Sequence, residues 1–574
     1  MNKFIFFVQI ICTIDYFVVI LQAECVARVQ ERVRIMENQT PTYGNDVEAQ
    51  MQQGQEMPPQ AAPTMGWRRP VSRRKQSGSF LQLLQNVNIA QALTIQQART
   101  LPNWLVGRSV AFFFIAFLAC TMVWGYPMEI QLAVIASISV LLFFYGSKLA
   151  TQKWASVSER TFLRNVFVLG LVVRLAWVLY CYYFFNPEHY GTTYGEGADV
   201  EWYMPFGGAI AEWVRGNEQM TFNELRLYWG SAIDDIGYPI WLAVLNLITF
   251  GRSDVLMPFI VKSFVGAYCA VCIYNVTSRH FGEGTARLAA LFVCLNPNII
   301  YWCGSMFKEA EMVFLCCLCV DLVDKTFTSV NKLTFKSLIP GVLVGSYLFF
   351  FRSALAVVMF LAMFAHIVLV SKRVMNTGKK IIAGVLVTGT LLVGMGDRLI
   401  TQAGDLFERA QSDSQKVNME WRSRRAGGND FAKYAGAAVF APLIFTIPFP
   451  TFNIANESQI LQRQLSGGSY IKNVLSFFVI MVLLSMLLSG EWRRHVFILA
   501  YTCGYLLTLV LSSFAQSGRF HMPIWPMLML FAAYGIQMAK MNVRLKRWFT
   551  VALCLEVVIC LVWNWFKLKG RGMI

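Results

Sequence analysis

The chain has 574 residues, of which 56% are hydrophobic and 14% are charged, and its formal net charge at pH 7 is +17. A soluble domain carries roughly 25% charged residues, so this composition excludes an ordinary soluble enzyme. Many apolar runs are long enough to cross a bilayer as helices, which takes about 20 residues. The short alternating segments that mark a β-barrel are missing. The sequence therefore predicts an all-α polytopic membrane protein.

The positive charge does not indicate nucleic-acid binding, because most basic residues lie in short runs between apolar segments, as the positive-inside rule describes. The chain has 14 cysteines, and all except Cys25 lie in or beside apolar segments. We expect these thiols to pack as small hydrophobic groups. The pair Cys269 and Cys272 falls inside a predicted membrane helix, which argues against a zinc or redox role.

Residues 1–104 are predicted to be an N-terminal apolar segment followed by a cytoplasmic tail. Residues 4–22 are apolar apart from Asp15 and are interpreted as a signal anchor or a membrane helix. They lack a convincing small-residue cleavage site, which disfavours a removed signal peptide. Residues 23–104 are rich in Gln, Arg and Pro, and we predict a mostly disordered basic tail there.

About thirteen membrane helices are predicted after the tail, divided between a hairpin (105–160) and a larger membrane domain (161–570). Their ranges are 109–126, 129–148, 162–185, 257–277, 286–303, 309–324, 338–351, 353–371, 380–396, 471–489, 495–515, 522–540 and 548–566. The run 237–250 is too short for a span and is predicted to lie at the membrane interface.

The loop charges predict the orientation. With these helices, five basic loops fall on one side, which we assign to the cytoplasm; they are 148–160, 278–287, 371–380, 491–495 and 540–547. The loops 186–256 and 397–470 then lie outside. Residues 186–236 hold nine acids against two arginines, which agrees with an outer location.

Asp199 stands out among the outer acids. It opens the string DVEWYMPFGGAIAEWV, in which apolar residues recur at spacings of three and four, as on one face of a helix. An Asp at such a position either caps the helix or serves as a functional acid facing the outer side. The residues alone leave both readings open.

The order of motifs resembles the GT-C superfamily of integral-membrane glycosyltransferases, in particular the protein O-mannosyltransferase and aminoarabinose-transferase-like branch. The stretch GADVEWYMPFGGAIAEW is similar to the first outer-loop motif, in which Tyr203 follows Asp199 by four residues. The segment from GYPIWLAVL to LNPNIIYWCG and the late element SGRFHMPIWPMLMLFAAYGI also resemble that branch. The resemblance covers roughly residues 160–540.

The resemblance implies an inverting transfer of a sugar from a polyprenyl-phosphate carrier to a glycan, lipid or protein acceptor on the outer face. Asp199 would be the general base that takes the acceptor proton, with Glu201 as a second candidate. The leaving phosphate needs fixed cations, and four candidates lie at predicted outer helix ends: Lys262, Lys308, Arg352 and Arg519. Each of them could instead only extend to the lipid headgroups.

Four further residues are candidates for the sugar or acceptor site: Tyr203, Tyr238, Glu309 and His521. Tyrosines at an outer face are ordinarily interfacial belt residues, Glu309 could simply pair with Lys308, and a lone His is commonly structural. Arg174 and Glu556 lie near the middle of predicted spans, where charges are costly. Since neither matches a family motif, we expect both to pack against polar partners in the bundle.

The sequence departs from the family in its hairpin and tail, and Gly237-Tyr238-Pro239 stands where the aminoarabinose branch has Lys-Pro-Pro. The motif has a single Asp, so we predict neither a metal site nor another cofactor, while metal dependence stays open. The expected setting is a bacterial inner membrane with a periplasmic active site.

Two alternative functions stay open. One is a polysaccharide polymerase or ligase using arginines of 397–470 (Arg409, Arg422, Arg424 and Arg425), and the other is a secondary transporter. The sugar, the acceptor, the carrier length and the oligomeric state are not specified by the sequence.

Overall fold

In the computed structural model, the described residues are 94–124, 130–189, 198–216, 221, 224, 235–251, 255–329, 335–370, 420, 445, 466–511 and 518–570. Within these ranges the chain forms helices and short connections, and no strand occurs there. The predicted all-α class is confirmed for the part of the chain that the structure describes. The predicted span 4–22 and nearly all of the outer loop 397–470 lie outside it.

The chain divides into two units. The first comprises residues 1–78 and 212–219, of which only 212–216 are described. The second comprises residues 79–211 and 220–574 and holds every site discussed below. The domain boundaries expected near residues 104 and 160 stay predictions. The last residues of the expected tail do fold, as the short helix α3 (Ile95–Arg99), which Thr94 and Gln97 cap reciprocally.

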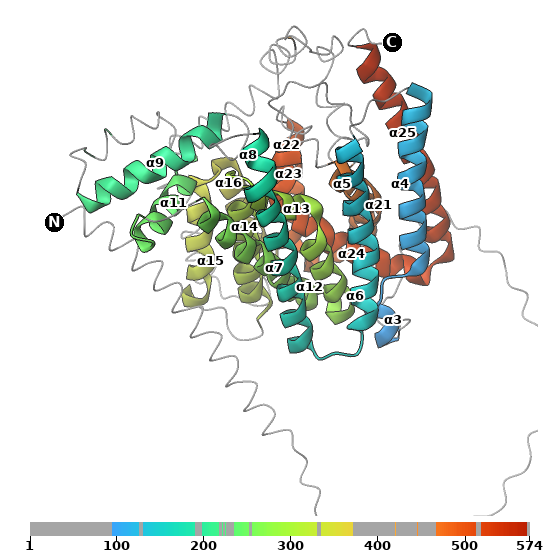
Figure 1. Cartoon of the computed structure of the whole chain (residues 1–574). Coiled ribbons are helices and arrows are strands. Elements are labelled where there is room, and N and C mark those ends of the chain that lie inside the picture. Colours follow the sequence, from blue (N-terminus) through green and yellow to red (C-terminus); the bar gives the residue numbers. More distant parts are fainter. Residues whose placement is uncertain are drawn as a thin grey trace, which may run out of the picture. The chain divides into compact units, whose positions relative to one another are not determined.

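The helices of the second unit follow the predicted spans closely (Figure 1). Their bounds are α4 (Asn103–Trp124), α5 (Ile130–Leu141), α6 (Ser147–Lys153), α7 (Glu159–Tyr180), α8 (Asn186–His189), α9 (Ala198–Arg215, whose last four residues belong to the first unit), α11 (Gly237–Ile248), α12 (Leu256–Leu295), α13 (Pro297–Tyr301), α14 (Glu309–Thr328), α15 (Phe335–Tyr347), α16 (Ser353–Val370), α21 (Ser466–Ser489), α22 (Val496–Leu511), α23 (Gly518–His521), α24 (Trp525–Met541) and α25 (Val543–Lys569). Short π-helical turns continue α5 and α7, at Leu142–Gly146 and Cys181–Phe185.

Seven of the described helical segments are long and apolar enough to cross a membrane, which identifies an integral membrane protein. They are Ile95–Val123, Ala133–Lys153, Glu159–Glu188, Leu256–Leu295, Gly467–Ser489, Gly518–Met541 and Val543–Phe566. The predicted count of about thirteen is not confirmed. Some predicted spans form shorter apolar helices, such as Ser353–Leu369, and 380–396 lies outside the described residues. Helix α11 has 12 residues, too few to span a bilayer.

Helix α12 contains two predicted spans joined at Gly282. The backbone there has φ 79° and ψ 168°, values that glycine adopts readily because it has no Cβ. Lys262, near the start of α12, donates to the carbonyl of Ser305, which lies well beyond Gly282 in the chain. The two limbs therefore run in opposite directions, as expected for 257–277 and 286–303.

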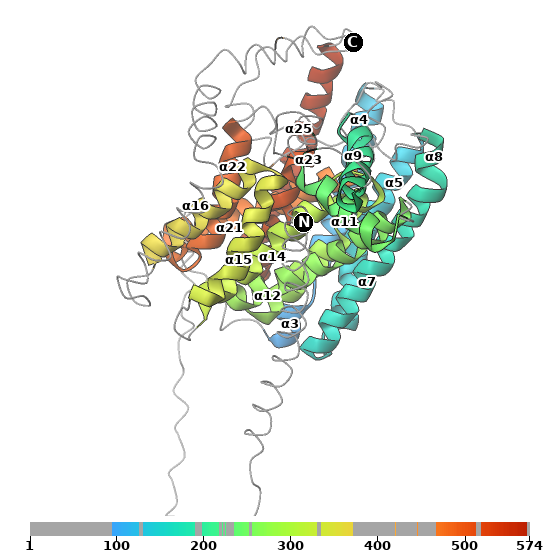
Figure 2. The ribbon, with the colours of Figure 1, turned by 90° about the vertical axis from the view of Figure 1, so that its left-hand side faces the viewer.

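The core of the second unit surrounds α12, which packs against α7, α14 and α24 (Figures 1 and 2). In the most apolar 18-residue stretch of Gly518–Met541, which contains α24, 94% of the residues are buried. The corresponding share for Val543–Phe566, in α25, is 28%. Helices α25 and α4 pack side by side. Their remaining apolar side chains are suited to lipid, since a helix in a bilayer does not need a polar outer face.

Four of the five basic loops meet at one end of the bundle, which we call the basic end. Arg99, just before α4, pairs with Glu283 at the turn of α12. Arg287 donates to carbonyls in the 148–160 loop, and Lys540 donates to the carbonyl of Gln97. His280 contacts His495. These contacts join the loops at 148–160, 278–287, 491–495 and 540–547, and the loop 371–380 lies outside the described residues.

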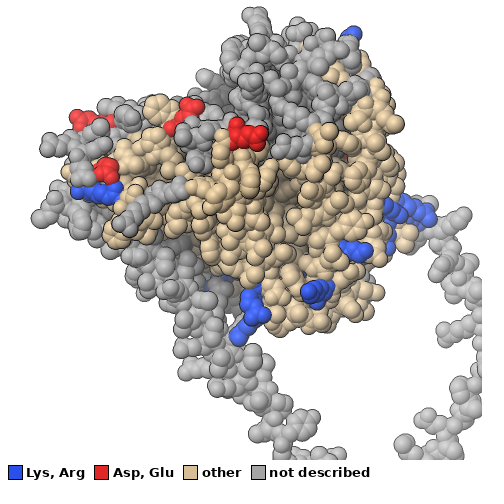
Figure 3. Space-filling view, viewed as in Figure 1, with Lys and Arg blue, Asp and Glu red and all other residues tan. Residues whose placement is uncertain are grey.

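The charges visible on the surface follow the same division. On the face drawn in Figure 3, Lys and Arg side chains lie mainly along the lower edge, and Asp and Glu side chains lie near the upper edge. Helix α7 begins at the lower edge and leads to α8 at the upper one (Figure 1). This arrangement agrees with the predicted separation of basic and acidic loops.

Arg174 is fully buried, and its guanidinium donates to the carbonyls of Gly170, Cys294 and Val293. Helix α12 ends at Leu295, so its last carbonyls lack the usual partners four residues on. Pro297 has no backbone N–H at all. The arginine supplies the missing donors, which confirms that it has polar partners inside the bundle. Glu556 likewise accepts a hydrogen bond from Asn473.

We expect Arg174→Met to lower the stability of the protein by about 2–5 kcal/mol, since buried carbonyls are left without donors. The shift in the thermal unfolding midpoint in detergent measures this. Arg164→Met is the matched control, because Arg164 lies on the same helix and is exposed. Equal shifts for the two variants would show that the carbonyl contacts contribute little.

Candidate functional site

A connection between α12 and α14 positions the first charged residues of the candidate site. It begins at the break at Asn296-Pro297, and side chains from three other elements donate to its carbonyls. Trp177 donates to Tyr301 (3.0 Å), Asn186 to Gly304 (3.1 Å) and Lys262 to Ser305 (2.7 Å). These donors replace the helical hydrogen bonds that the break removes. The connection thereby presents Lys308 and Glu309 at the end of the bundle opposite the basic end.

Three ion pairs bind the start of α14 to its surroundings. Lys308 pairs with Asp235, just before α11, and donates to the carbonyl of Phe351 at 2.8 Å. Glu309 pairs with Arg519 of α23. Glu311 lies 3.7 Å from the ammonium of Lys262. Both glutamates are buried, and buried charges are tolerated when they are paired.

Arg519 and Arg352 both lie against aromatic rings. The guanidinium of Arg519 is 4.4 Å from the ring centroid of Phe307, and that of Arg352 is 4.3 Å from the ring of Phe520. Tyr505 joins Arg352 to Phe520, the residue after Arg519. Its hydroxyl donates to the carbonyl of Phe520 at 2.9 Å and accepts from Arg352 at 3.4 Å. Both arginines keep partial exposure, so they combine a fixed position with access from outside.

Tyr238 lies on α11 and is fully buried. Its ring is 4.8 Å from the Lys262 ammonium and meets the ring of Tyr203 edge-on at 5.0 Å. Burial raises the pKa of the Tyr238 hydroxyl well above its ordinary value, and the nearby carboxylate of Glu311 raises it further. The hydroxyl is therefore a neutral donor at physiological pH, and it donates to the sulfur of Met306 at 3.3 Å.

Gly237 allows α11 to approach the 348–352 turn. A Cβ at this position would lie 2.7 Å from the ring of Phe351 and 2.9 Å from the carbonyl of Phe350. Gly237→Ala should therefore displace Tyr238 and lower stability by about 1–3 kcal/mol. Unfolding of the purified protein tests this, with Gly208→Ala as control because a Cβ there meets nothing within 4 Å. Indistinguishable midpoints would contradict the prediction.

His521 is fully buried, and its Nδ1 lies 2.5 Å from the amine of Lys472 on α21. The histidine ends α23, two residues after Arg519. Sequence reasoning identified His521 but not Lys472, since nothing near residue 472 resembles a motif. Only the packing of α21 against α24 brings the two side chains together.

The predicted general base lies in the first turn of α9. The side chain of Asp199 is outside the described residues, so its role stays a prediction. Glu201, the second candidate, is exposed. Tyr203 is buried on the same helix and contacts Tyr238. This contact connects the Asp199 motif to α11, as the predicted order of elements requires.

Most of the predicted site residues are thus brought together. Contacts connect α9, α11, α12, the start of α14 and α23 into one network, in which Phe307 links Lys262 to Arg519. Its predicted members are Tyr203, Tyr238, Lys262, Lys308, Glu309, Arg352 and Arg519. Glu309 pairs with Arg519 rather than with its neighbour Lys308, the partner considered from the sequence. Sequence reasoning missed Asp235 and Glu311 as partners. The sequence features that could have indicated them are the acidic pair just before Gly237, which contains Asp235, and the position of Glu311 two residues after Glu309.

The described residues contain no group of three or more His, Cys, Asp or Glu side chains that could hold a metal ion. The described cysteines form no disulfide, and those in the predicted spans of α12 and α14 are buried. Metal dependence of the protein stays open, because Asp199 and much of the outer loops lie outside the residues concerned.

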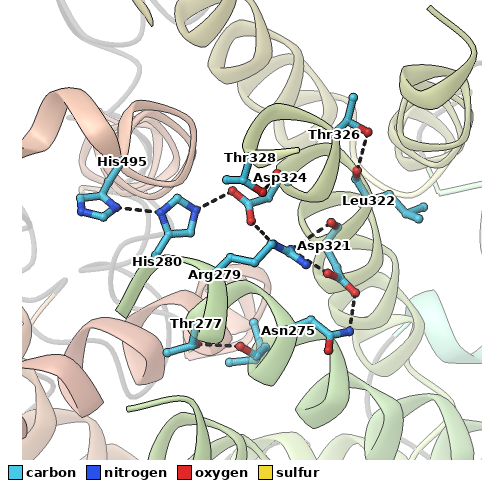
Figure 4. Close-up of polar contacts among 11 residues, drawn as sticks. Asn275, Thr277, Arg279, His280, Asp321, Leu322, Asp324, Thr326, Thr328 and His495 are labelled. Carbon is cyan, nitrogen blue, oxygen red and sulfur yellow. Dashed lines mark hydrogen bonds and ion pairs between the residues drawn. The ribbon is translucent and has the colours of Figure 1, made fainter. Parts of the chain in front are cut away.

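A second polar cluster lies at the basic end (Figure 4). Arg279 bridges Asp321 (2.7 Å) and Asp324 (2.6 Å), and His280 contacts Asp324 at 2.6 Å and His495 at 2.8 Å. The cluster joins α12, α14 and the start of α22. Its charged groups contact one another within the cluster, so we interpret the cluster as structural: it holds α12, α14 and the start of α22 together at the basic end.

No protein-family model, curated protein or solved structure matches the chain. The functional argument therefore rests on the residues of this chain and their geometry.

Proposed function

We propose that the protein is an inverting glycosyltransferase that moves a sugar from a polyprenyl-phosphate carrier to an acceptor on the side of the membrane opposite the basic end. One observation carries the proposal. Two partly exposed arginines lie at the same end of the bundle: Arg519 pairs with Glu309, and Arg352 stacks on Phe520, the residue after Arg519. The Asp199 helix reaches this end through the contact between Tyr203 and Tyr238.

The proposed reaction has one displacement step. The acceptor hydroxyl attacks the anomeric carbon of the sugar while Asp199 takes its proton. The bond between that carbon and the phosphate oxygen breaks, and its electron pair stays on the phosphate. The phosphodiester carries one negative charge, whereas the released monoester carries about −1.5 to −2 at pH 7. Cations that are already in place stabilise this added charge.

The geometry suggests a division among the four candidate cations. Arg352 and Arg519 are accessible and would contact the phosphate. Lys262 and Lys308 are buried and donate to backbone carbonyls, so we propose that they hold the 305–308 connection and the 351 turn in place. Tyr238 and Glu309 would then orient Lys262 and Arg519, and Tyr203 would hold Tyr238.

A transfer assay tests the proposed function. Membranes containing the protein are supplied with a radiolabelled polyprenyl-phosphate sugar, and release of polyprenyl phosphate is measured against membranes that lack the protein. We expect release that depends on the protein. Unchanged donor across a panel of polyprenyl-phosphate hexoses and pentoses would contradict the proposal. Donor accumulation in sealed vesicles without cleavage would instead favour the transporter alternative.

The polymerase or ligase alternative depends on arginines in 397–470. Apart from isolated positions and the start of α21, this loop lies outside the described residues. No structural observation therefore favours that alternative, and product length in the same assay separates the two reactions.

A further inference from the structure

Arg108 joins the first and the last long helix of the described chain, α4 and α25, at the basic end (Figure 1). It lies in the second turn of α4, and its Nη1 donates to the carbonyl of Lys546 at 2.8 Å and to the hydroxyl of Thr550 at 2.9 Å. Thr550 donates to the same carbonyl at 3.3 Å. These contacts link residues 438 positions apart in the chain. They hold the guanidinium at a fixed place on the seam between the two helices.

A second cation and an indole ring lie at the same seam. The ammonium of Lys546 is 5.8 Å from the ring centroid of Trp104, and the guanidinium of Arg108 is 5.9 Å from the same centroid. The indole is held in turn by Phe549, whose ring meets it edge-on at 5.7 Å. We call Trp104, Arg108 and Lys546 the seam site. It combines two cations with the N–H donor of an indole.

The protein uses few of the hydrogen-bond donors of the seam site. Arg108 has five N–H donors, and two of them serve Lys546 and Thr550. Among the described residues, no partner accepts from the other three or from the ammonium of Lys546. Both side chains are partly exposed, so a ligand outside the protein can reach these donors.

The two helices place no carboxylate beside the seam site. Helix α4 contains no acidic residue, and α25 contains only Glu556. Glu556 lies about 15 Å beyond Lys546 along the helix, and it accepts a hydrogen bond from Asn473 of α21. The cations of the seam site are therefore not paired with an acid of the helices that carry them.

Beyond the seam site, the outward side of both helices is apolar. Ile115 (48%) and Leu118 (53%) on α4 and Val551 (54%) and Val558 (53%) on α25 are about half exposed. In an integral membrane protein such a surface faces the hydrocarbon chains of the bilayer. Trp104 then lies at the level of the lipid headgroups, where Trp is enriched. The seam site is thus at the boundary between the hydrocarbon and the charged end of the bundle.

We propose that the seam site binds the headgroup of an anionic phospholipid from the leaflet at the basic end, with its phosphate between Arg108 and Lys546 and its acyl chains along α4 and α25. Basic pockets between membrane helices on the cytoplasmic side bind headgroups of this kind. Phosphatidylglycerol fits the site better than phosphatidylcholine, because the choline group would bring a third positive charge close to two fixed ones. Such a lipid site would exist whether or not the protein transfers sugars.

A lipid bound at the seam would bridge α4 and α25 and would stabilise the folded protein, since the unfolded chain lacks the site. The first test measures the thermal unfolding midpoint of the full-length protein in a nonionic detergent. Phosphatidylglycerol, phosphatidylcholine with the same acyl chains, and glycerol 3-phosphate are added at equal concentrations. We expect phosphatidylglycerol to raise the midpoint by a few degrees and the other two to leave it unchanged. Equal stabilisation by phosphatidylcholine would overturn the preference for an anionic headgroup, and equal stabilisation by glycerol 3-phosphate would overturn the assignment to a lipid.

Acylation of lysine amines by an N-hydroxysuccinimide ester, measured by mass spectrometry, shows which amine the lipid covers. We expect phosphatidylglycerol to slow the labelling of Lys546 but not of Lys153, an exposed lysine that ends α6 at the same end of the bundle. Equal protection of both lysines would mean that the lipid does not bind specifically at the seam. A Lys546 that is unreactive without lipid would mean that another part of the chain covers the site. Either result would overturn the proposal.

Lys546→Met separates lipid binding from folding, because the carbonyl that accepts from Arg108 belongs to the backbone and remains. We expect this variant to bind phosphatidylglycerol about 5-fold to 50-fold more weakly, while its midpoint without lipid changes little. Lys153→Met is the matched control and should bind as the wild type does. Arg108→Met should lose both lipid binding and the contacts between α4 and α25. If that variant does not fold, Lys546→Met still decides, since wild-type affinity in it would overturn the proposal.

Discussion

Asp199→Asn is expected to lower kcat for sugar transfer by about 10²–10⁴-fold, the usual contribution of a general base, while the KM for the lipid-linked donor changes little. The amide keeps the size of the side chain and its capacity to accept a hydrogen bond from the start of α9, but it cannot take the acceptor proton. Initial rates over a range of donor concentrations in membranes measure both quantities.

Two other acids serve as comparisons for Asp199. Glu188 is an exposed acid before the same motif, and Glu188→Gln should leave kcat unchanged. Glu201→Gln tests the second candidate base directly. If Asp199→Asn retains the wild-type rate and Glu201→Gln loses it, the base is Glu201. If neither variant loses activity, the proposed mechanism is wrong.

Arg519→Met is expected to have the largest combined effect on stability and activity. Glu309 is fully buried, so removal of its arginine leaves an uncompensated charge, at a cost of about 3–5 kcal/mol. The variant also removes a proposed phosphate contact, and kcat/KM should fall by about 10²–10³-fold. Unfolding in detergent and donor kinetics measure the two effects separately.

The double variant Arg519→Met with Glu309→Gln separates these contributions. It removes the buried charge together with its partner, so most of the lost stability should return, whereas activity should stay low. Recovery of activity along with stability would mean that Arg519 acts only through the fold. Full stability of the single variant would contradict the buried ion pair.

Composition and periodicity were sufficient for the fold class and for most helix ranges. An apolar run of the length of 162–185 forms a helix in a membrane because a backbone without water must satisfy its hydrogen bonds internally. The gathering of the basic loops at one end was predictable as well, since basic residues near helix ends concentrate on one side of a membrane. The hydrogen bond from Arg287 to the carbonyl of Trp154 confirms that two of these loops share one end.

The family resemblance also predicted Arg519 and Glu309 as site residues. Their pairing with each other was not predictable. The two residues lie 210 positions apart in the chain, and the local sequence offered Lys308 as the nearer partner for Glu309. A connection held by Trp177, Asn186 and Lys262 turns Lys308 toward Asp235 instead.

The sequence by itself determined that this is a helical membrane protein with a basic end and a set of candidate charges at the opposite end. Only the tertiary structure decided which of those charges are neutralised by carboxylates and which keep access from outside. It also introduced Lys472, which no motif marked. The physical reason is that hydropathy and charge patterns act along the chain, whereas ion pairing and burial depend on which helices pack together.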